Sequence, residues 1–392
     1  MSGADAAERR DLAAHVGPLP EHALVALTDL AGLPSAGPWR LRRLMWHHPP
    51  DEAWCLLRDG GDLHPAVHRA LDVSTLRALR REAGLARPGA VLERCARLGV
   101  DTVPVSDPRY PEPLRHDAQA PVVLFARGDL AALDARRVAI VGTRNATAAG
   151  RATAAELGEE LARAGVTVVS GLARGIDGAA HRGARAAGGP GRAVGVVANG
   201  LDHPYPRQHT DLWRWVGEAG VLLSEWAPGV TPEPWRFPLR NRILAAIAEL
   251  LVVVESRDRG GSMITVEAAT KRDVPVLAVP GSVRSRASDG TNWLIDQGAQ
   301  PVRSVDDVLV ALGLRNVGQQ RLPFGRRPAP DTFQQLVLDL CAARPCTLDM
   351  LAVGLGCGPA DAALAAFRLA RSGWLEEVGG WFEPAGSRLL SA

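Results

Sequence analysis

A glycine, a threonine and an arginine follow one short apolar run in a pattern suited to binding phosphate. Gly142, Thr143 and Arg144 come directly after residues 137–141, and a segment rich in Ala, Glu and Leu continues to about Ala164. This order is typical of the strand–turn–helix opening of a parallel α/β unit. Amides at a helix start attract anions, and an arginine offers a planar fork to phosphate. On these residues alone, a tight turn with a solvated arginine is the simpler explanation.

The same chemistry recurs after the next predicted strand. Residues 166–169 are β-branched and lead into Ser170 and Gly171, and Arg174 precedes a second probable helix start. Open α/β sheets bind their ligands outside the carboxyl ends of the strands. We therefore expect both strand ends to line one crevice.

An aromatic residue among arginines suggests a different contact. Phe237 lies beside Arg236, Arg240, Asn241 and Arg242 at the predicted start of a helix. Single-stranded nucleic acid is held in this way, because bases stack on aromatic rings while cations follow the backbone. The alternative, a buried Phe237 whose arginines form surface ion pairs, is equally consistent with this segment because aromatic residues are often core.

Other kinds of site lack their patterns. The phosphate-binding P-loop motif is absent, and so is the Gly-x-Gly-x-x-Gly fingerprint after a strand. Asp177 and His181 share a helix face but have no third ligand in register, so we predict no metal site. Ser170, Ser224, Glu225, Glu255 and Glu267 form no recognisable nucleophile–base arrangement, and we predict no catalytic residues and no cofactor.

Composition indicates a multidomain globular protein. The chain has 392 residues, 46% of them hydrophobic, which predicts two or three domains. Its net charge of +2 does not by itself announce a nucleic-acid binder, although a balanced total can contain a basic face. No apolar run reaches membrane-spanning length and residues 1–10 do not resemble a signal peptide, so we expect a cytoplasmic protein without membrane contact.

The pattern of elements divides the chain into four parts. Residues 1–100 read as helical, with a turn at residues 32–38 that faintly resembles a helix–hairpin–helix. Residues 101–316 alternate strands and helices, which predicts a doubly wound parallel sheet, a Rossmann-like α/β fold. The predicted strands cover residues 121–125, 138–141, 166–169, 193–198, 221–224, 250–254 and 276–279.

The C-terminal part reads as a linker and a small domain. Residues 317–330 carry Pro, Gly and Gln without periodicity, which is typical of a linker. Residues 331–392 predict three helices and a hairpin that turns at Gly379 and Gly380, the pattern of a winged helix. Four arginines stand there against seven acidic residues, which favours a protein contact over a DNA contact.

The ordered set of motifs resembles the DprA family, also called Smf. The resemblance covers about residues 105–300 and is carried by short segments that occur in family order. These are Tyr110-Pro111, Val141 to Arg144, Ser170 to Asp177, Gly200-Leu201-Asp202, Tyr205-Pro206, Leu223-Ser224-Glu225, Phe237-Pro238, Arg240-Asn241-Arg242, Gly261-Ser262, Thr265 and Val279-Pro280-Gly281.

The resemblance implies a non-catalytic protein that binds and protects single-stranded DNA. It further implies that the protein loads the RecA recombinase onto that DNA during natural transformation, and that it forms a homodimer through an extended Rossmann domain. The implied DNA-binding residues are Gly142, Thr143, Arg144, Ser170, Gly171, Arg174, Arg207, Arg236, Phe237, Arg240, Asn241 and Arg242. Thr143 stands where the family frequently has Ser.

An enzymatic alternative uses the same kind of fold. The phosphoribohydrolases of the LOG type carry a glycine-rich loop with a catalytic glutamate. The comparable segment of this sequence is residues 260–267, which ends in Glu267. The glycine before Thr265 is absent and the glutamate spacing is shifted. The alternative function is therefore a nucleotide or nucleotide-sugar hydrolase that depends on Glu267.

Overall fold

The computed structural model describes residues 12–189, 191–314, 330–372 and 374–384. The chain divides into two compact units, Met1–Gly318 and Gln319–Ala392. The predicted linker at residues 317–330 lies outside the described residues except for its last position. Each unit is described by itself below.

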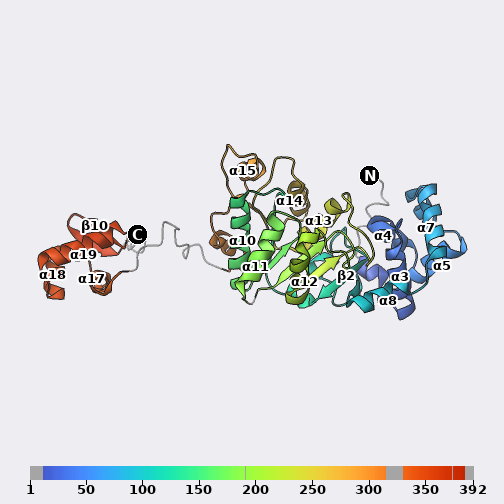
Figure 1. Ribbon diagram of the computed structural model, residues 1–392, viewed down its shortest axis with the longest axis horizontal. Coiled ribbons are helices and arrows are strands. Elements are labelled where there is room, and N and C mark those ends of the chain that lie inside the picture. Colours follow the sequence, from blue (N-terminus) through green and yellow to red (C-terminus); the bar gives the residue numbers. More distant parts are fainter. Residues whose placement is uncertain (1–11, 190, 315–329, 373, 385–392) are drawn as a thin grey trace. The chain divides into compact units, whose positions relative to one another are not determined.

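Short helices fill the N-terminal part of the first unit, as its sequence predicts. They are α2 (Leu12–Val16), α3 (Glu21–Gly32), α4 (Gly37–His47), α5 (Pro50–Asp59), α6 (Pro65–Ala70), α7 (Val73–Leu85) and α8 (Ala90–Leu98). The predicted turn at residues 32–38 separates α3 from α4. Asp72 caps α7 by accepting the amide hydrogen of Thr75 at 2.8 Å. Figure 1 shows these helices gathered at the β2 end of the unit.

A nine-stranded sheet forms the centre of this unit, in the order β1-β2-β6-β5-β4-β3-β7-β8-β9. The strands are β1 (Asp101–Pro104), β2 (Val123–Gly128), β3 (Arg137–Val141), β4 (Thr167–Ser170), β5 (Ala193–Val197), β6 (Val221–Ser224), β7 (Leu250–Val253), β8 (Val276–Ala278) and β9 (Gln300–Pro301). The strands from β6 to β9 pair in parallel. Strand order reverses between β3 and β7, which is where such sheets bind ligands.

The sheet is not parallel throughout, which corrects the prediction. Strand β2 pairs antiparallel with β6, and β1 pairs antiparallel with β2. The sequence pattern also missed β1 and β9 as strands. Both contain a proline, and β9 has only two residues, so neither carries the apolar run that identifies a strand.

Alternate residues of the central strands pack into two different cores. In β3, Val138 and Ile140 face one core and Ala139 and Val141 face the other. The first core is covered by the long helices α10 (Ala148–Arg163) and α11 (Ile176–Ala187), together with α16 (Val305–Ala311). The second is covered by α12 (Thr210–Ala219), α13 (Arg236–Ile247), α14 (Gly261–Thr270) and α15 (Asp289–Asp296). The sheet is therefore the middle of three layers.

Shorter helical turns complete the first unit. They are α9 (Glu112–Arg115) and the 3₁₀ turns η1 (Leu130–Leu133) and η2 (Arg207–His209).

The second hydrophobic core continues without a break from the sheet into the N-terminal helices, because it contains Leu27 and Leu44 as well as Phe125.

The second unit contains three helices and a hairpin. They are α17 (Thr332–Ala343), α18 (Leu348–Leu355), α19 (Pro359–Arg371), β10 (Leu375–Val378) and β11 (Trp381–Pro384). Thr347 caps α18, and Gly356 ends it in the left-handed region at φ 62°. Gly354 lies inside this helix. Gly379 and Gly380 turn the hairpin, both with positive φ.

Within the described part of the chain, no single helix combines the length and apolar character that a membrane span requires. The helices α18 and α19 reach that length and composition only as a pair, and the pair is bent by 115°.

Candidate nucleic-acid interface

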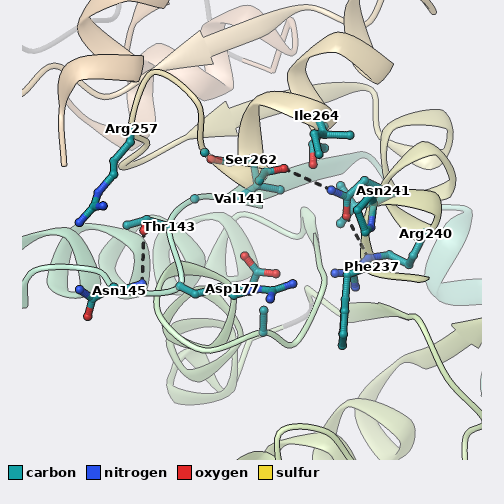
Figure 2. Close-up of a pocket in the computed structure, with 18 of the residues that line it drawn as sticks. Val141, Thr143, Asn145, Asp177, Phe237, Arg240, Asn241, Arg257, Ser262 and Ile264 are labelled. Carbon is teal, nitrogen blue, oxygen red and sulfur yellow. Dashed lines mark hydrogen bonds between the residues drawn. The ribbon is translucent and has the colours of Figure 1, made fainter. Parts of the chain in front are cut away.

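A pocket of about 530 Å³ opens at the point where the strand order reverses between β3 and β7. It is lined by the loops that follow β3, β4 and β7 and by the first turns of α13 and α14. In Figure 2, Phe237 and Arg240 approach the pocket from one side, and Asn145 and Arg257 lie on the other. The structure thus brings the Gly142 to Arg144 segment and the Phe237 segment to one pocket, and the segment after β4 reaches it through Ala173 and Asp177.

The loop after β3 is fixed by contacts with the end of β7. The Thr143 amide donates to the Glu255 carbonyl at 2.7 Å, and the Glu255 carboxylate accepts the Thr147 amide hydrogen at 2.9 Å. Gly142 is required because a Cβ there would lie 2.5 Å from the Ile176 side chain and 2.8 Å from the Glu255 carbonyl oxygen. The loop therefore enters the pocket with a defined backbone.

The helix that follows Arg144 was expected to bind anions at its start, but that start does not line the pocket. Helix α10 begins only at Ala148, outside the pocket lining, and the Thr147 hydroxyl caps it by accepting from the Gly150 amide at 2.9 Å. Helices α13 and α14 instead bring their starts to the pocket, and neither has a side-chain cap or an acidic residue in its first turn. In α13 the Arg236 amide donates to the Glu233 carbonyl and Pro238 has no amide hydrogen. The start of α14, with Gly261 and Ser262, is therefore the one that offers backbone amides to an anion on this side of the pocket.

An arginine stacks on the aromatic ring of the pocket. The Arg144 guanidinium carbon lies 4.7 Å from the centre of the Phe237 ring, and Arg144 is exposed. The Tyr205 ring lies 5.4 Å from the Phe237 ring on a tilted plane. Phe237 is only half-buried, so of the two alternatives the structure favours a ring that faces the pocket over a core residue. Tyr205 belongs to this cluster although it is missing from the predicted site residues.

A buried arginine supplies positive charge at the bottom of the pocket. Arg240 is 4% exposed and donates to the carbonyls of Gly171, at 2.9 Å, and Val196. Burial lowers the pKa of Arg240 to about 10, and the nearby Asp177 opposes that shift. The guanidinium is therefore charged at neutral pH. A side chain at Gly171 would overlap it, which explains the glycine there.

Positive charge dominates the lining. Arg144, Arg240 and Arg257 line the pocket, and Asp177 is the one acidic residue among the lining residues that the structure describes. Burial raises the pKa of Asp177, while Arg240 opposes the shift. The exposed Arg257 was missed by the sequence reasoning. Its place after the predicted strand at residues 250–254 was the signal that could have found it.

The predicted site residues separate into three groups. Gly142, Thr143, Arg144, Phe237, Arg240 and Asn241 line the pocket. Ser170 and Gly171 are buried behind it, and the Ser170 hydroxyl donates to the Ile140 carbonyl at 2.6 Å. Arg174 and Arg207 are exposed but are not among the lining residues.

Two predicted arginines of α13 are engaged elsewhere. Arg242 is 8% exposed and pairs with the Glu225 carboxylate at 2.5 Å. Arg236 stacks with Trp226 and Trp235, at 4.5 Å and 4.9 Å from the ring centres. Neither lines the pocket. Arg242 lies two positions after Arg240 and so projects from a different helix face, whereas Arg236 is drawn aside by the two indole rings.

The hydrolase alternative receives no geometric support. Glu267 is exposed, lies outside the pocket lining and pairs with Lys271 at 2.6 Å. That hydrogen bond lowers the pKa of the Glu267 carboxyl, which suits a surface carboxylate rather than a proton donor. Among the described residues, no group of three or more His, Cys, Asp or Glu side chains could hold a metal ion.

Comparison with known families assigns a family to the part of the chain that contains the pocket. The sequence profile of the family described as DNA recombination-mediator protein A matches residues 101–313. The chain belongs to this family. Every lining residue of the pocket falls within the matched region. The family description names a DNA recombination mediator, in agreement with the expected non-catalytic role.

Individual relatives support the assignment to the DNA recombination-mediator protein A family. The DNA processing protein DprA of Bacillus subtilis strain 168 is 41% identical over 227 residues, which are 58% of this chain and 75% of that protein. Protein Smf of Escherichia coli K12 is 36% identical over 230 residues, 58% of each chain. The X-ray structure of DprA from Streptococcus pneumoniae superposes with a TM-score of 0.60 and 30% identity, covering 75% of this chain and 98% of that one.

Proposed function

We propose that this protein binds single-stranded DNA in the pocket between β3 and β7. The observation that carries the proposal is the Arg144 guanidinium stacked on Phe237, at 4.7 Å, beside the uncapped start of α14. A stacking platform for bases and several donors for phosphate thus occur together. A duplex does not offer its base faces to such a ring, so the arrangement suits an unpaired strand.

The proposal extends the family's role to this chain. We infer that the bound strand is protected and presented to a RecA recombinase during natural transformation, and that the protein works as a homodimer in the cytoplasm. Membership in a family of DNA recombination mediators supports the role in recombination. Loading can be measured as RecA-dependent ATP hydrolysis on oligonucleotides coated with single-strand binding protein, with and without this protein.

The boundaries of the chain's functional parts are also proposals. We propose a helical part at residues 1–100, a DNA-binding α/β part at 101–316, a linker at 317–330 and a winged helix at 331–392. Three helices followed by a two-stranded hairpin support the last assignment. The exposed face of α19 carries Leu364, Phe367 and Asp361 as well as Arg368, which favours a protein partner for this domain.

A single substitution tests DNA binding. Fluorescence anisotropy of a labelled oligo-dT is measured across a salt series for the wild type and for Arg144→Ala. The substitution removes one phosphate contact and the guanidinium that stacks on the Phe237 ring. It should weaken binding about tenfold and flatten the salt slope by about one. The control is Arg214→Ala, an exposed arginine on α12 outside the pocket. Equal affinity of both variants and the wild type contradicts the proposal.

A further inference from the structure

A second surface of the first unit combines an exposed indole with basic side chains. Trp39 lies in the first turn of α4 and is 47% exposed. It lines two cavities, one of about 350 Å³ bounded by α4 and one of about 880 Å³ that reaches the end of α14. We call this surface the Trp39 groove and define it by Trp39, Arg40, Arg42, Arg43, Lys271 and Arg272.

Positive charge exceeds negative charge in the groove. Asp117 is the one acidic residue among the lining residues that the structure describes, and Arg272 pairs with it at 2.5 Å. Arg40 is exposed, and its guanidinium donates to the Ser35 carbonyl at 3.1 Å. Lys271 pairs with Glu267 at 2.6 Å, but both side chains are about two-thirds exposed and such pairs are weak. Arg40 and Lys271 thus carry exposed charge that a polyanion can reach.

The indole is held in place from the direction of the pocket. The Arg242 guanidinium carbon lies 5.9 Å from the centre of the Trp39 ring, and Arg242 is itself fixed by Glu225. Helix α13 therefore has Phe237 and Arg240 in the pocket and Arg242 against Trp39. Figure 1 shows α13 between α14 and α4. One helix connects the two surfaces.

The separation of the two surfaces suits one DNA strand. Phe237 lines the pocket and Ala246 lines the larger cavity, nine positions later on α13. At 1.5 Å per residue these positions are about 14 Å apart along the helix. A stacked single strand covers that distance with about four nucleotides. The adjacent helix α14 begins in the pocket lining with the exposed Gly261 and Ile264, and the exposed Lys271, directly after its last residue, lies in the groove.

We propose that the Trp39 groove is a second site for the DNA strand held in the pocket, where one base stacks on Trp39 and phosphates pair with Arg40 and Lys271. The inference rests on the proposed function, because the strand must first occupy the pocket. An acidic peptide would use the cations but not the exposed indole, and it would have no reason to continue from the pocket. A single strand uses both features.

Oligonucleotide length separates the two sites. Fluorescence anisotropy is measured with a labelled oligo-dT of about 3 nucleotides, which is too short to span the distance from the pocket to the groove, and with one of about 20 nucleotides, which reaches both. Trp39→Ala should leave the short oligonucleotide unaffected and weaken the long one about tenfold, the effect of one lost stacked base. Arg40→Ala should flatten the salt slope for the long oligonucleotide alone by about one.

Matched variants distinguish the groove from other causes. Trp381→Ala removes an exposed tryptophan of the second unit, and Arg77→Ala removes an exposed arginine of α7 outside both cavities. Neither should change the affinity for the long oligonucleotide. Wild-type affinity of Trp39→Ala for the long oligonucleotide overturns the inference while the effect of Arg144→Ala preserves the proposed function. Polyglutamate is also added at the same total charge as the long oligonucleotide. If the long oligonucleotide then no longer binds more tightly than the short one, the inference is overturned, because the groove binds any polyanion.

Discussion

Two arginines only two positions apart on α13 have different surroundings. Arg240 donates to backbone carbonyls and lines the pocket that we propose for DNA. Arg242 points away from the pocket, pairs with Glu225 at 2.5 Å and lies over Trp39. Burial raises the pKa of the Glu225 carboxyl and the Arg242 charge opposes the shift, so the carboxylate depends on its partner. Residue type alone does not say which arginine binds DNA.

Arg242→Ala should therefore act on stability rather than on the pocket. The Glu225 side chain is 1% exposed, and removal of its partner leaves a buried carboxylate without a counter-charge. Such losses cost about 3 kcal/mol of unfolding free energy. Urea denaturation measures this cost, and anisotropy with a short oligo-dT should give nearly wild-type affinity for the folded protein.

The matched double variant tests the cause of that loss. Glu225→Leu combined with Arg242→Met removes both charges and keeps apolar volume, so it should recover most of the lost stability. A variant Arg242→Ala that unfolds like the wild type but binds the short oligonucleotide as poorly as Arg144→Ala would place Arg242 in the DNA site instead.

Among the elements, α11 carries a histidine that the fold keeps uncharged. His181 is fully buried, and its ring nitrogen Nε2 lies 3.3 Å from the Val194 carbonyl of β5. Burial lowers the pKa of His181 from 6.5 to about 4. The unfolded chain therefore binds a proton at a higher pH than the folded chain, and its proton binding favours unfolding between these two pKa values.

The pH dependence of stability should show this histidine. Its contribution is fully present above about pH 6.5 and is lost as the pH falls toward 4, for a total of about 3 kcal/mol. Urea denaturation of the wild type and of His181→Gln across this range measures the difference in slope. The control His68→Gln changes an exposed histidine of α6 and should keep the wild-type slope. A slope in His181→Gln equal to that of the wild type contradicts the assignment.

The elements also show what a sequence pattern can and cannot supply. Local apolar runs predicted β3, β6 and β7 within a residue, because strand propensity is a property of the run itself. The pattern failed where a distant residue decides the outcome. Thr147 and Glu255 close the start of α10, and α14 opens toward the pocket instead. The pocket's location followed from the fold class, whereas its donors did not.

At the scale of the whole molecule, the N-terminal helices and the sheet share one hydrophobic core. That core includes Leu27 and Leu44 of the helices together with Val103 and Phe125 of the sheet. Arg94 of α8 also pairs with Asp202, in the loop after β5, at 2.7 Å. The second unit has a separate core of its own. The proposed boundary at residue 100 therefore separates two kinds of secondary structure that share one continuous hydrophobic core.

Truncation distinguishes a shared core from independent domains. A chain that ends at residue 314 keeps the first unit's cores complete, so its main urea transition, followed by tryptophan fluorescence, should match that of the full chain. A chain of residues 101–314 exposes apolar surface that the helices covered, and it should lose several kcal/mol of unfolding free energy or aggregate, since burial contributes about 25 cal/mol per Å². If residues 101–314 instead unfold at the same urea concentration as residues 1–314, the N-terminal helices form a domain of their own and the shared core adds nothing to stability.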